Sequence, residues 1–321
     1  MTEPNNTIFQ AEDTGLSSSG QKNIVLSDSI DPTSDVDLYR LQVDQGDVVT
    51  FNIEAQENGS GLDSVLRLFA PNGSELALND DSQGPFEPFS LDSYLEYTAT
   101  TTQDYYVGVS NYRNFDYDPN TEGTGTPGFS TGDYDLGITI FNGINGTEGA
   151  DNLTGTSGQD YISGLGGNDT LSGGGQKDYL LGGTGNDFLR GDDGDDLLRG
   201  GEGTDVIRAG SGNDTLGGEA GRDSLYGGEG SDIFAIGSEQ DTIFDFRDGS
   251  DLLLLTDGSS FSDLSITLGT SSGTSTVISS FGSDIATLMG ISPGQIDSND
   301  FVGSEVVSPN FRASDEPVDK M

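Results

Sequence analysis

A phrase of nine residues repeats without interruption from residue 146 to residue 244, and it restricts the fold more than any other feature of the chain. Read in register, the copies are GTEGADNLT, GTSGQDYIS, GLGGNDTLS, GGGQKDYLL, GGTGNDFLR, GDDGDDLLR, GGEGTDVIR, AGSGNDTLG, GEAGRDSLY, GGEGSDIFA and a degenerate eleventh, IGSEQDTIF. The sixth position is Asp in every copy, and the eighth is always a large apolar residue. The fourth is Gly except at Gln176 and Glu239, and the first is Gly except at Ala209 and Ile236. A fixed period of this length predicts stacked repeats.

Each position of the repeat has a physical interpretation. Glycine supplies the positive φ angles that a tight, repeated turn requires. The residues around position eight predict a short strand with one inward apolar side chain, which a single repeat cannot bury but a stack can. Asp is common in turns because it bonds to nearby backbone groups, but that preference does not explain an Asp in every copy. Carboxylates and backbone carbonyls are the oxygen ligands that Ca²⁺ takes, so the pattern predicts calcium binding.

This phrase resembles the GGxGxDxUx nonapeptide of RTX (haemolysin-type) calcium-binding proteins. The resemblance implies a parallel β-roll in which two repeats make one turn, so that repeats n and n+2 stack. The candidate calcium ligands then form two columns. They are Asp151, Asp169, Asp187, Asp205, Asp223 and Asp241 on one edge, and Asp160, Asp178, Asp196, Asp214 and Asp232 on the other. Pairing neighbours among the first ten predicts about eight ions. The extra carboxylates of DDGDD at 192–196 are interpreted as a solvated acidic face in preference to an added site.

Before the repeats, the chain alternates short apolar runs with turn residues, which predicts an antiparallel β-sandwich. The runs are NIVLS, DLYRLQV, DVVTFNIEA, SVLRLFA, SELALN, SYLEYTA, DYYVGVSN and DYDLGITIF. The phrases DVDLYRLQVDQGDVVTFNI, LDSVLRLFAPNGSELALNDDS, YLEYTATTTQDYYVGVSN and GDYDLGITI resemble those of bacterial pre-peptidase C-terminal (PPC) domains. That resemblance implies a sandwich appended to secreted peptidases, with an accessory or binding role.

We therefore predict an all-β chain in which an antiparallel β-sandwich is followed by a parallel β-roll (an RTX solenoid) and a β-rich C-terminal cap. The predicted boundaries are a polar lead-in at 1–23, the PPC-like sandwich at 24–143, the roll at 146–244, the cap at 245–303 and a flexible tail at 304–321.

Two groups of sandwich residues have alternative interpretations. The first group forms either a further cation site or ordinary turns; it contains Asp63, Asn79, Asp80, Asp81 and Asp92. The second group forms either a binding face or part of the core, and packing is the favoured interpretation; it contains Tyr105, Tyr106, Tyr112, Tyr117 and Tyr134.

Composition excludes several functions. The chain has 55 acidic and 12 basic residues, a formal net charge of −43, and contains no Cys and no His. Thiolate chemistry, Ser-His-Asp relays and HExxH zinc sites are therefore absent. So negative a chain repels nucleic acid and anionic lipid, and no apolar run is long enough to span a membrane. We predict no enzyme activity, no catalytic residues and no cofactor other than Ca²⁺.

The sequence thus predicts a secreted, extracellular bacterial protein whose repeats fold on binding calcium. The opening residues MTEPNNTIFQAEDTG show no basic region and no apolar core of a signal peptide, and the RTX resemblance implies export by type I secretion. A polysaccharide, a surface or a protein remain open as ligands of the PPC-like domain. The alternative function is an accessory subunit, or the C-terminal half, of a secreted hydrolase whose catalytic domain is on another chain.

Overall fold

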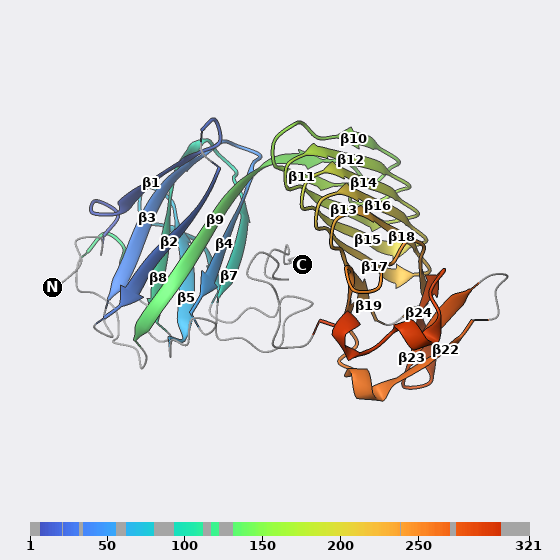
Figure 1. Cartoon of the computed structure of the whole chain (residues 1–321). Helices are drawn as coiled ribbons and strands as arrows, with labels where there is room; N and C mark the ends of the chain where they lie inside the picture. Colours follow the sequence, from blue (N-terminus) through green and yellow to red (C-terminus); the bar gives the residue numbers. More distant parts are fainter. Residues whose placement is uncertain are drawn as a thin grey trace. The chain divides into compact units, whose positions relative to one another are not determined.

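The structure is a computed structural model that describes residues 7–20, 22–31, 35–55, 62–79, 93–111, 117–121, 131–237, 239–269 and 274–302. It has two compact units, Met1–Asn142 and Gly143–Ser308. The described residues form β-strands and three short 3₁₀ helices, which confirms the all-β prediction (Figure 1). None of these residues forms a helix long and apolar enough to cross a membrane.

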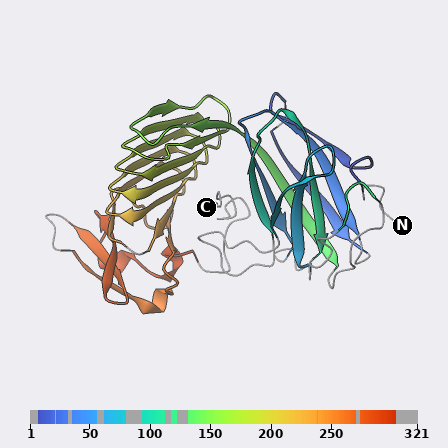
Figure 2. The same cartoon turned by 180° about the vertical axis from the view of Figure 1, so that it is seen from behind.

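The described residues of the first unit form nine strands, and the eight apolar runs of the sequence each overlap one of these strands. The strands are β1 (Glu12–Ser17), β2 (Asn23–Ile30), β3 (Val36–Val43), β4 (Val48–Glu54), β5 (Ser64–Phe69), β6 (Glu75–Asn79), β7 (Tyr94–Thr98), β8 (Gln103–Asn111) and β9 (Gly132–Asn145). One sheet has the order β1-β3-β8-β5-β6. In the other, β4 pairs with β7 and β9, and β2 pairs with β9. All of these pairs are antiparallel except β1 with β3. Figure 2 shows the strands of this unit from behind, coloured from blue to green.

The two sheets of this unit share one apolar core. Leu41 and Val107 from the first sheet and Phe51 and Ile138 from the second belong to the same buried cluster. The antiparallel sandwich is therefore confirmed, and its core follows from the alternation of apolar and polar residues along each strand.

Strand β1 corrects one expectation, because residues 12–17 lie in the stretch predicted to be a loose lead-in. Leu16 is buried in the sandwich core, and Thr14 Oγ1 donates a hydrogen bond of 2.8 Å to the Arg40 carbonyl. The polar composition hid this strand, because burial of one leucine and pairing with β3 are enough to hold it at the sheet edge.

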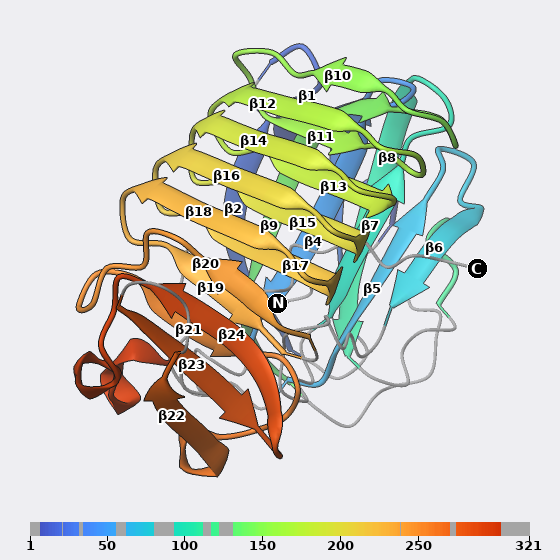
Figure 3. The same cartoon turned by 90° about the vertical axis from the view of Figure 1, so that its right-hand side faces the viewer.

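In the second unit, the repeats form two parallel sheets of short strands (Figure 3). The even-numbered strands are β10 (Asn152–Thr154), β12 (Thr170–Gly175), β14 (Phe188–Asp193), β16 (Val206–Ser211), β18 (Ser224–Glu229) and β20 (Asp241–Ile243). The odd-numbered strands are β11 (Asp160–Ser163), β13 (Tyr179–Thr184), β15 (Leu197–Gly203), β17 (Thr215–Gly221) and β19 (Ile233–Ile236). Partners such as Leu171 and Leu189 are two repeats apart. Repeats n and n+2 therefore stack, as the RTX resemblance implied.

Position eight of the repeat forms the core of the roll. Leu171, Leu180, Leu189 and Leu198 are each 0% exposed and belong to one cluster with the equivalent residues of later repeats. This core is thin, because position eight supplies only one large apolar side chain per repeat. The stack must therefore depend on further interactions at its edges.

The roll continues beyond residue 244, where the sequence had placed the start of the cap. Strand β21 (Leu252–Leu255) pairs in parallel with β19, with Leu252 opposite Ile233. Strand β24 (Ser283–Met289) pairs in parallel with β20, and β23 (Ser275–Ser280) and β22 (Leu264–Leu268) extend that sheet antiparallel. The helices η1 (Phe261–Asp263), η2 (Pro293–Gln295) and η3 (Ser298–Asp300) complete the described part of this end. The predicted tail at 304–321 lies outside the described residues.

Candidate metal sites

The Asp residues of position six form two hydrogen-bonded ladders along the roll. In each ladder, the backbone N–H of one Asp donates to Oδ1 of the Asp two repeats later. The Asp151 N–H bonds to Asp169 Oδ1 at 2.7 Å, and the Asp160 N–H bonds to Asp178 Oδ1 at 2.8 Å. The same bond recurs along both columns up to Asp241 and Asp232. In the structure, the Asp residues of each predicted column are thus linked to one another along one edge of the roll.

The second carboxylate oxygen behaves differently, because in seven interior Asp residues Oδ2 is buried without a hydrogen-bond partner. These residues are Asp169, Asp178, Asp187, Asp196, Asp205, Asp214 and Asp223. Each of the seven residues is at most 3% exposed. A buried acceptor without a partner costs about 1–3 kcal/mol, and a charged acceptor costs more. In each interior turn, one buried carboxylate oxygen therefore lacks the hydrogen bond or counter-ion that would stabilise its charge.

At the start of each column, the protein itself supplies the missing donors. Thr147 donates its N–H and its hydroxyl to Asp151 Oδ2 at 2.7 and 2.8 Å. Thr156 does the same to Asp160 Oδ2 at 2.6 and 2.9 Å. These threonines occupy position two of the repeat. The following position-two residues, from Leu165 to Gly228, have positive φ, which turns this peptide group differently.

Position one explains why the repeat begins with glycine. A Cβ at Gly182 would lie within 3.0 Å of both Asp187 Oδ2 and the carbonyl oxygen of Gly200. The same cradle of one carboxylate oxygen and one carbonyl oxygen recurs beside six other glycines. They are Gly146, Gly155, Gly164, Gly173, Gly191 and Gly200. Glycine therefore keeps open a space on which oxygen atoms converge from two stacked turns.

Burial shifts the protonation of the interior carboxylates in the metal-free roll. Loss of hydration raises the pKa of Asp178 and Asp214 to about 8, and that of Asp196 to about 7. The ladder hydrogen bonds partly oppose this rise, whereas neighbouring carboxylates add to it. Such a carboxylate needs either a proton or a cation near neutral pH.

Position five forms a further ladder that the sequence reasoning missed. The Asn186 N–H donates to Asn168 Oδ1 at 2.9 Å, and the Thr204 N–H donates to Asn186 Oδ1 at 2.8 Å. Asp195 and Asn213 continue this pattern on the other edge. The available signal was the recurrence of Asn immediately before the Asp. These bonds run opposite to those of the Asp ladder, so each turn is tied to both of its neighbours.

The acidic run at 192–196 has protein partners for its extra carboxylates. Asp192 pairs with Arg190 at 2.7 Å and accepts a bond of 2.6 Å from Ser172. Asp193 accepts from Ser211 at 3.1 Å, and Asp195 belongs to the position-five ladder. These contacts make the run part of the surface of the roll, in line with the interpretation that it is not an added site.

In the sandwich, the structure favours packing for most of the predicted aromatic group. Tyr105, Tyr117 and Tyr134 are buried, and Tyr106 is half-buried. Tyr112 lies outside the described residues. Of the predicted cation group, Asp63 and Asn79 are described, whereas Asp80, Asp81 and Asp92 lie outside the described residues, so that site stays a prediction.

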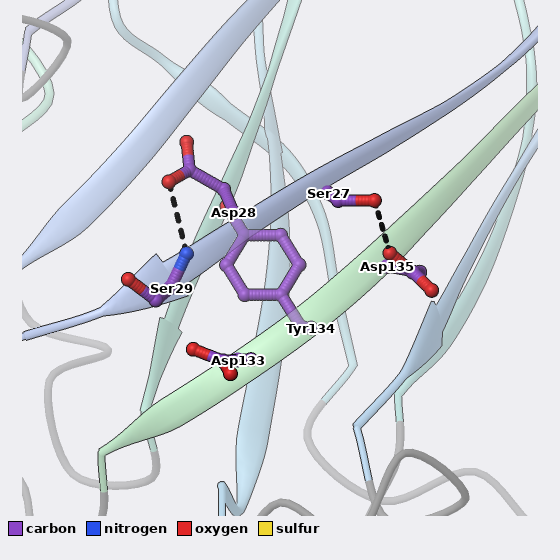
Figure 4. Close-up of a pocket in the computed structure, with 6 residues that line it drawn as sticks. All are labelled: Ser27, Asp28, Ser29, Asp133, Tyr134 and Asp135. Atoms are coloured by element: carbon purple, nitrogen blue, oxygen red, sulfur yellow. Dashed lines mark hydrogen bonds between the residues drawn. The ribbon is translucent and has the colours of Figure 1, made fainter.

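One acidic cavity does lie in the sandwich, between β2 and β9 (Figure 4). It has a volume of about 330 Å³ and is lined by Ser27, Asp28, Ser29, Asp133, Tyr134 and Asp135. The Tyr134 hydroxyl donates to Asp37 Oδ2 at 2.6 Å, and the Tyr39 hydroxyl donates to Asp28 Oδ2 at 3.0 Å. Burial raises the pKa of both tyrosines, so they remain donors. This network gives the buried Asp37 carboxylate and the half-buried Asp28 carboxylate hydrogen-bond donors within the sandwich.

Comparison with known families agrees with the geometry of both units. The model of the RTX calcium-binding nonapeptide repeat (4 copies) matches residues 145–180, 181–216 and 208–243. The model of the bacterial pre-peptidase C-terminal domain matches residues 35–111.

The fold and its Asp ladders thus define a solenoid of calcium-binding repeats joined to a β-sandwich. The chain therefore contains RTX calcium-binding nonapeptide repeats and an N-terminal PPC domain. Both matched modules are non-catalytic.

Among solved structures, the chain is similar to parts of three bacterial proteins. The pre-peptidase C-terminal domain of a Bacillus anthracis collagenase is 13% identical, with a TM-score of 0.25, over 40% of this chain and 93% of that one. The extracellular lipase LipA of Serratia marcescens is 18% identical, with a TM-score of 0.28, over 49% and 39%. The AlgE6R3 subunit of the Azotobacter vinelandii mannuronan C5-epimerase is 24% identical, with a TM-score of 0.25, over 55% and 93%. No curated protein matches the chain.

The raised pKa values predict how acidity affects the metal-free roll. Because the pKa of Asp178 and Asp214 rises from 3.8 to about 8 in the folded state, the folded roll binds more protons than the unfolded chain between these pH values. Stability in EDTA should therefore fall as pH rises through this window. Urea unfolding followed by circular dichroism at several pH values measures this. Substitution of both residues by Asn should reduce the pH dependence, while Asp196, Asp205 and Asp241 maintain part of it. Stability that rises with pH would contradict the assignment.

Proposed function

We propose that residues 146–244 bind calcium along both Asp columns and fold on binding it. The observation that carries this proposal is the set of seven buried Oδ2 atoms without a hydrogen-bond partner. A proton neutralises such an oxygen only at the acidic side of its raised pKa. A divalent cation neutralises it at any pH at which the ion is available, and the family match supports Ca²⁺ as that cation.

The eleven predicted Asp residues are the proposed carboxylate ligands, and about eight ions follow from pairing the first ten along their columns. Each of these pairs contains at least one of the seven unpartnered oxygens. Within the described residues, no group of three or more acidic side chains gathers around one point. Backbone carbonyls, such as that of Gly200 beside Asp187 Oδ2, are therefore proposed to supply much of the remaining coordination.

Calcium binding and folding are proposed to be one process. The glycine-rich backbone loses much conformational entropy on ordering, and each repeat buries one large apolar side chain at position eight to offset that loss. Stacking also brings the carboxylates of each column close together. The free energy of ion binding is then folding free energy.

Hydrogen exchange of the full chain, with mass spectrometry of peptides, tests this proposal. At a pH above about 8, where protons no longer neutralise the interior carboxylates, peptides from 146–244 should be protected by at least about tenfold in millimolar calcium relative to EDTA, because the stack then orders only when calcium neutralises them. Peptides from β3 to β8 serve as the internal control and should change little. Equal protection of the roll in both conditions would refute calcium-dependent folding.

The effect of losing one Asp ligand on calcium-dependent folding should depend on the position of that Asp in its column. Asp187 has an unpartnered Oδ2 and two ladder neighbours, whereas Thr147 already holds Asp151 Oδ2. Asp187→Asn should therefore raise the calcium concentration at half-folding several-fold more than Asp151→Asn does. The titration is followed by circular dichroism of the two full-length variants. Equal shifts would contradict stacking as the basis of binding.

The PPC domain is proposed to act as a binding or accessory module outside the cell, in a protein that is itself not an enzyme. The alternative, an accessory part of a secreted hydrolase, is supported by the name of the matched family, which refers to peptidases. A neighbouring gene for a peptidase that lacks this domain would favour the alternative. A polysaccharide, a surface or a protein remains the proposed class of ligand.

We further propose an extracellular location. Support comes from the RTX match and from the availability of calcium, which is low in the cytosol and abundant outside. The sequence implies type I secretion with an address near the C-terminal end. Deletion of residues 262–321 in the native host should then abolish the appearance of the truncated chain in the medium, with a cytosolic enzyme as the leakage control. Undiminished export would place the address elsewhere.

A further inference from the structure

A guanidinium group lies against the last carboxylates of the second Asp column. Arg247 Nη2 is 3.3 Å from Asp232 Oδ2 and 3.1 Å from Asp251 Oδ1, and it donates a bond of 2.6 Å to the Gly230 carbonyl. The Asp232 and Asp251 side chains are 0% and 1% exposed. Two buried carboxylates and one backbone carbonyl therefore converge on a single positive group.

Asp251 is the continuation of the ladder, although it falls outside the nine-residue register. The Asp232 N–H donates to Asp251 Oδ1 at 3.2 Å, which is the bond that links successive Asp residues throughout the column. The next residue, Leu252, pairs with Ile233, so the strand register also continues. Asp251 lies one residue beyond the position that the nine-residue period predicts, so the eleven copies of the repeat do not include it.

The two ends of this column are closed in a similar way. At the first turn, the Thr156 N–H donates to the Asp four residues later, Asp160. At the last turn, the Arg247 N–H donates to the Asp four residues later, Asp251, at 2.7 Å. Arg247 thus occupies the place of the position-two threonine. It brings a cation where Thr156 brings a hydroxyl.

The oxygen atoms around the guanidinium are of the kind that Ca²⁺ binds. Ca²⁺ takes carboxylates and backbone carbonyls, and the interior carboxylates of this column have an Oδ2 atom without any partner. We propose that Arg247 occupies the position of a metal ion at the end of the column, and that it masks one further calcium site formed by Asp232, Asp251 and the Gly230 carbonyl. This proposal rests on the proposed calcium binding of the roll.

As a consequence, the carboxylates of the last turn are neutralised without calcium. Arginine remains protonated at any physiological pH, so the Asp232 and Asp251 pair has its counter-ion before any metal arrives. The Asp232 and Asp251 pair therefore adds no ion to the about eight that pairing the first ten Asp residues predicts.

Calcium counting on full-length variants tests this inference. Wild type, Arg247→Ala, Arg247→Gln and Arg222→Ala are dialysed to equilibrium against saturating calcium, and bound calcium is measured by elemental mass spectrometry. Removal of the guanidinium should let the chain bind about one more ion than wild type. Arg222 is exposed on the same roll, and its substitution removes the same charge, so that variant should match wild type.

Two further measurements separate the outcomes. The double variant Arg247→Ala with Asp251→Asn should return to the wild-type count, because the unmasked site has lost a carboxylate. If folded Arg247→Ala, or Arg247→Gln where the alanine variant does not fold, binds the same number of ions as wild type, the inference is wrong. If wild type itself binds no calcium, the proposed function fails, and this inference fails with it.

Discussion

The roll depends on buried carboxylates that the protein supplies with only half of their partners. Oδ1 of each interior Asp is held by the backbone of the neighbouring turn, as in the bond of 2.7 Å from Asp169 to Asp187. Oδ2 of the same side chain has no donor, and in six of these seven residues it lies beside the glycine of position one. An ionised oxygen in such a place is unfavourable until a cation or a proton reaches it. The same Oδ2 atoms therefore destabilise the metal-free stack and supply the binding energy for a cation.

Stacking makes these atoms act together. Each Asp bonds to the turn before it, while the position-five side chains bond in the opposite direction, as Asn168 does with Asn186. Non-glycine residues such as Leu165 and Glu219 also adopt positive φ to keep the turns in register. Such conformations cost about 1–2 kcal/mol each, so neighbouring turns must hold them in place. The ends of the columns are distinct, because Thr147, Thr156 and Arg247 supply donors there.

The sequence alone predicts the period and, from the single apolar position in each copy, a stack of repeats, whereas the two-repeat turn and the two Asp columns follow from the RTX resemblance. It also predicts the strands of the sandwich from their alternation. Strand β1 is missed because it buries a single apolar residue, Leu16. Asp251 is missed because one inserted residue breaks the period, although the ladder bond from Asp232 persists. Which oxygen of each Asp lacks a partner depends on peptide orientation, and spacing does not reveal that.

Crystals of the full chain grown in calcium would test the central claim most directly. Anomalous diffraction should place an ion beside the Oδ2 atom of each of the seven interior residues that lack a hydrogen-bond partner. Calcium would lie at about 2.3–2.6 Å from these oxygens and from nearby backbone carbonyls. A well-ordered roll that lacks such peaks, with each Oδ2 bonded to a protein donor or to water, would contradict the account.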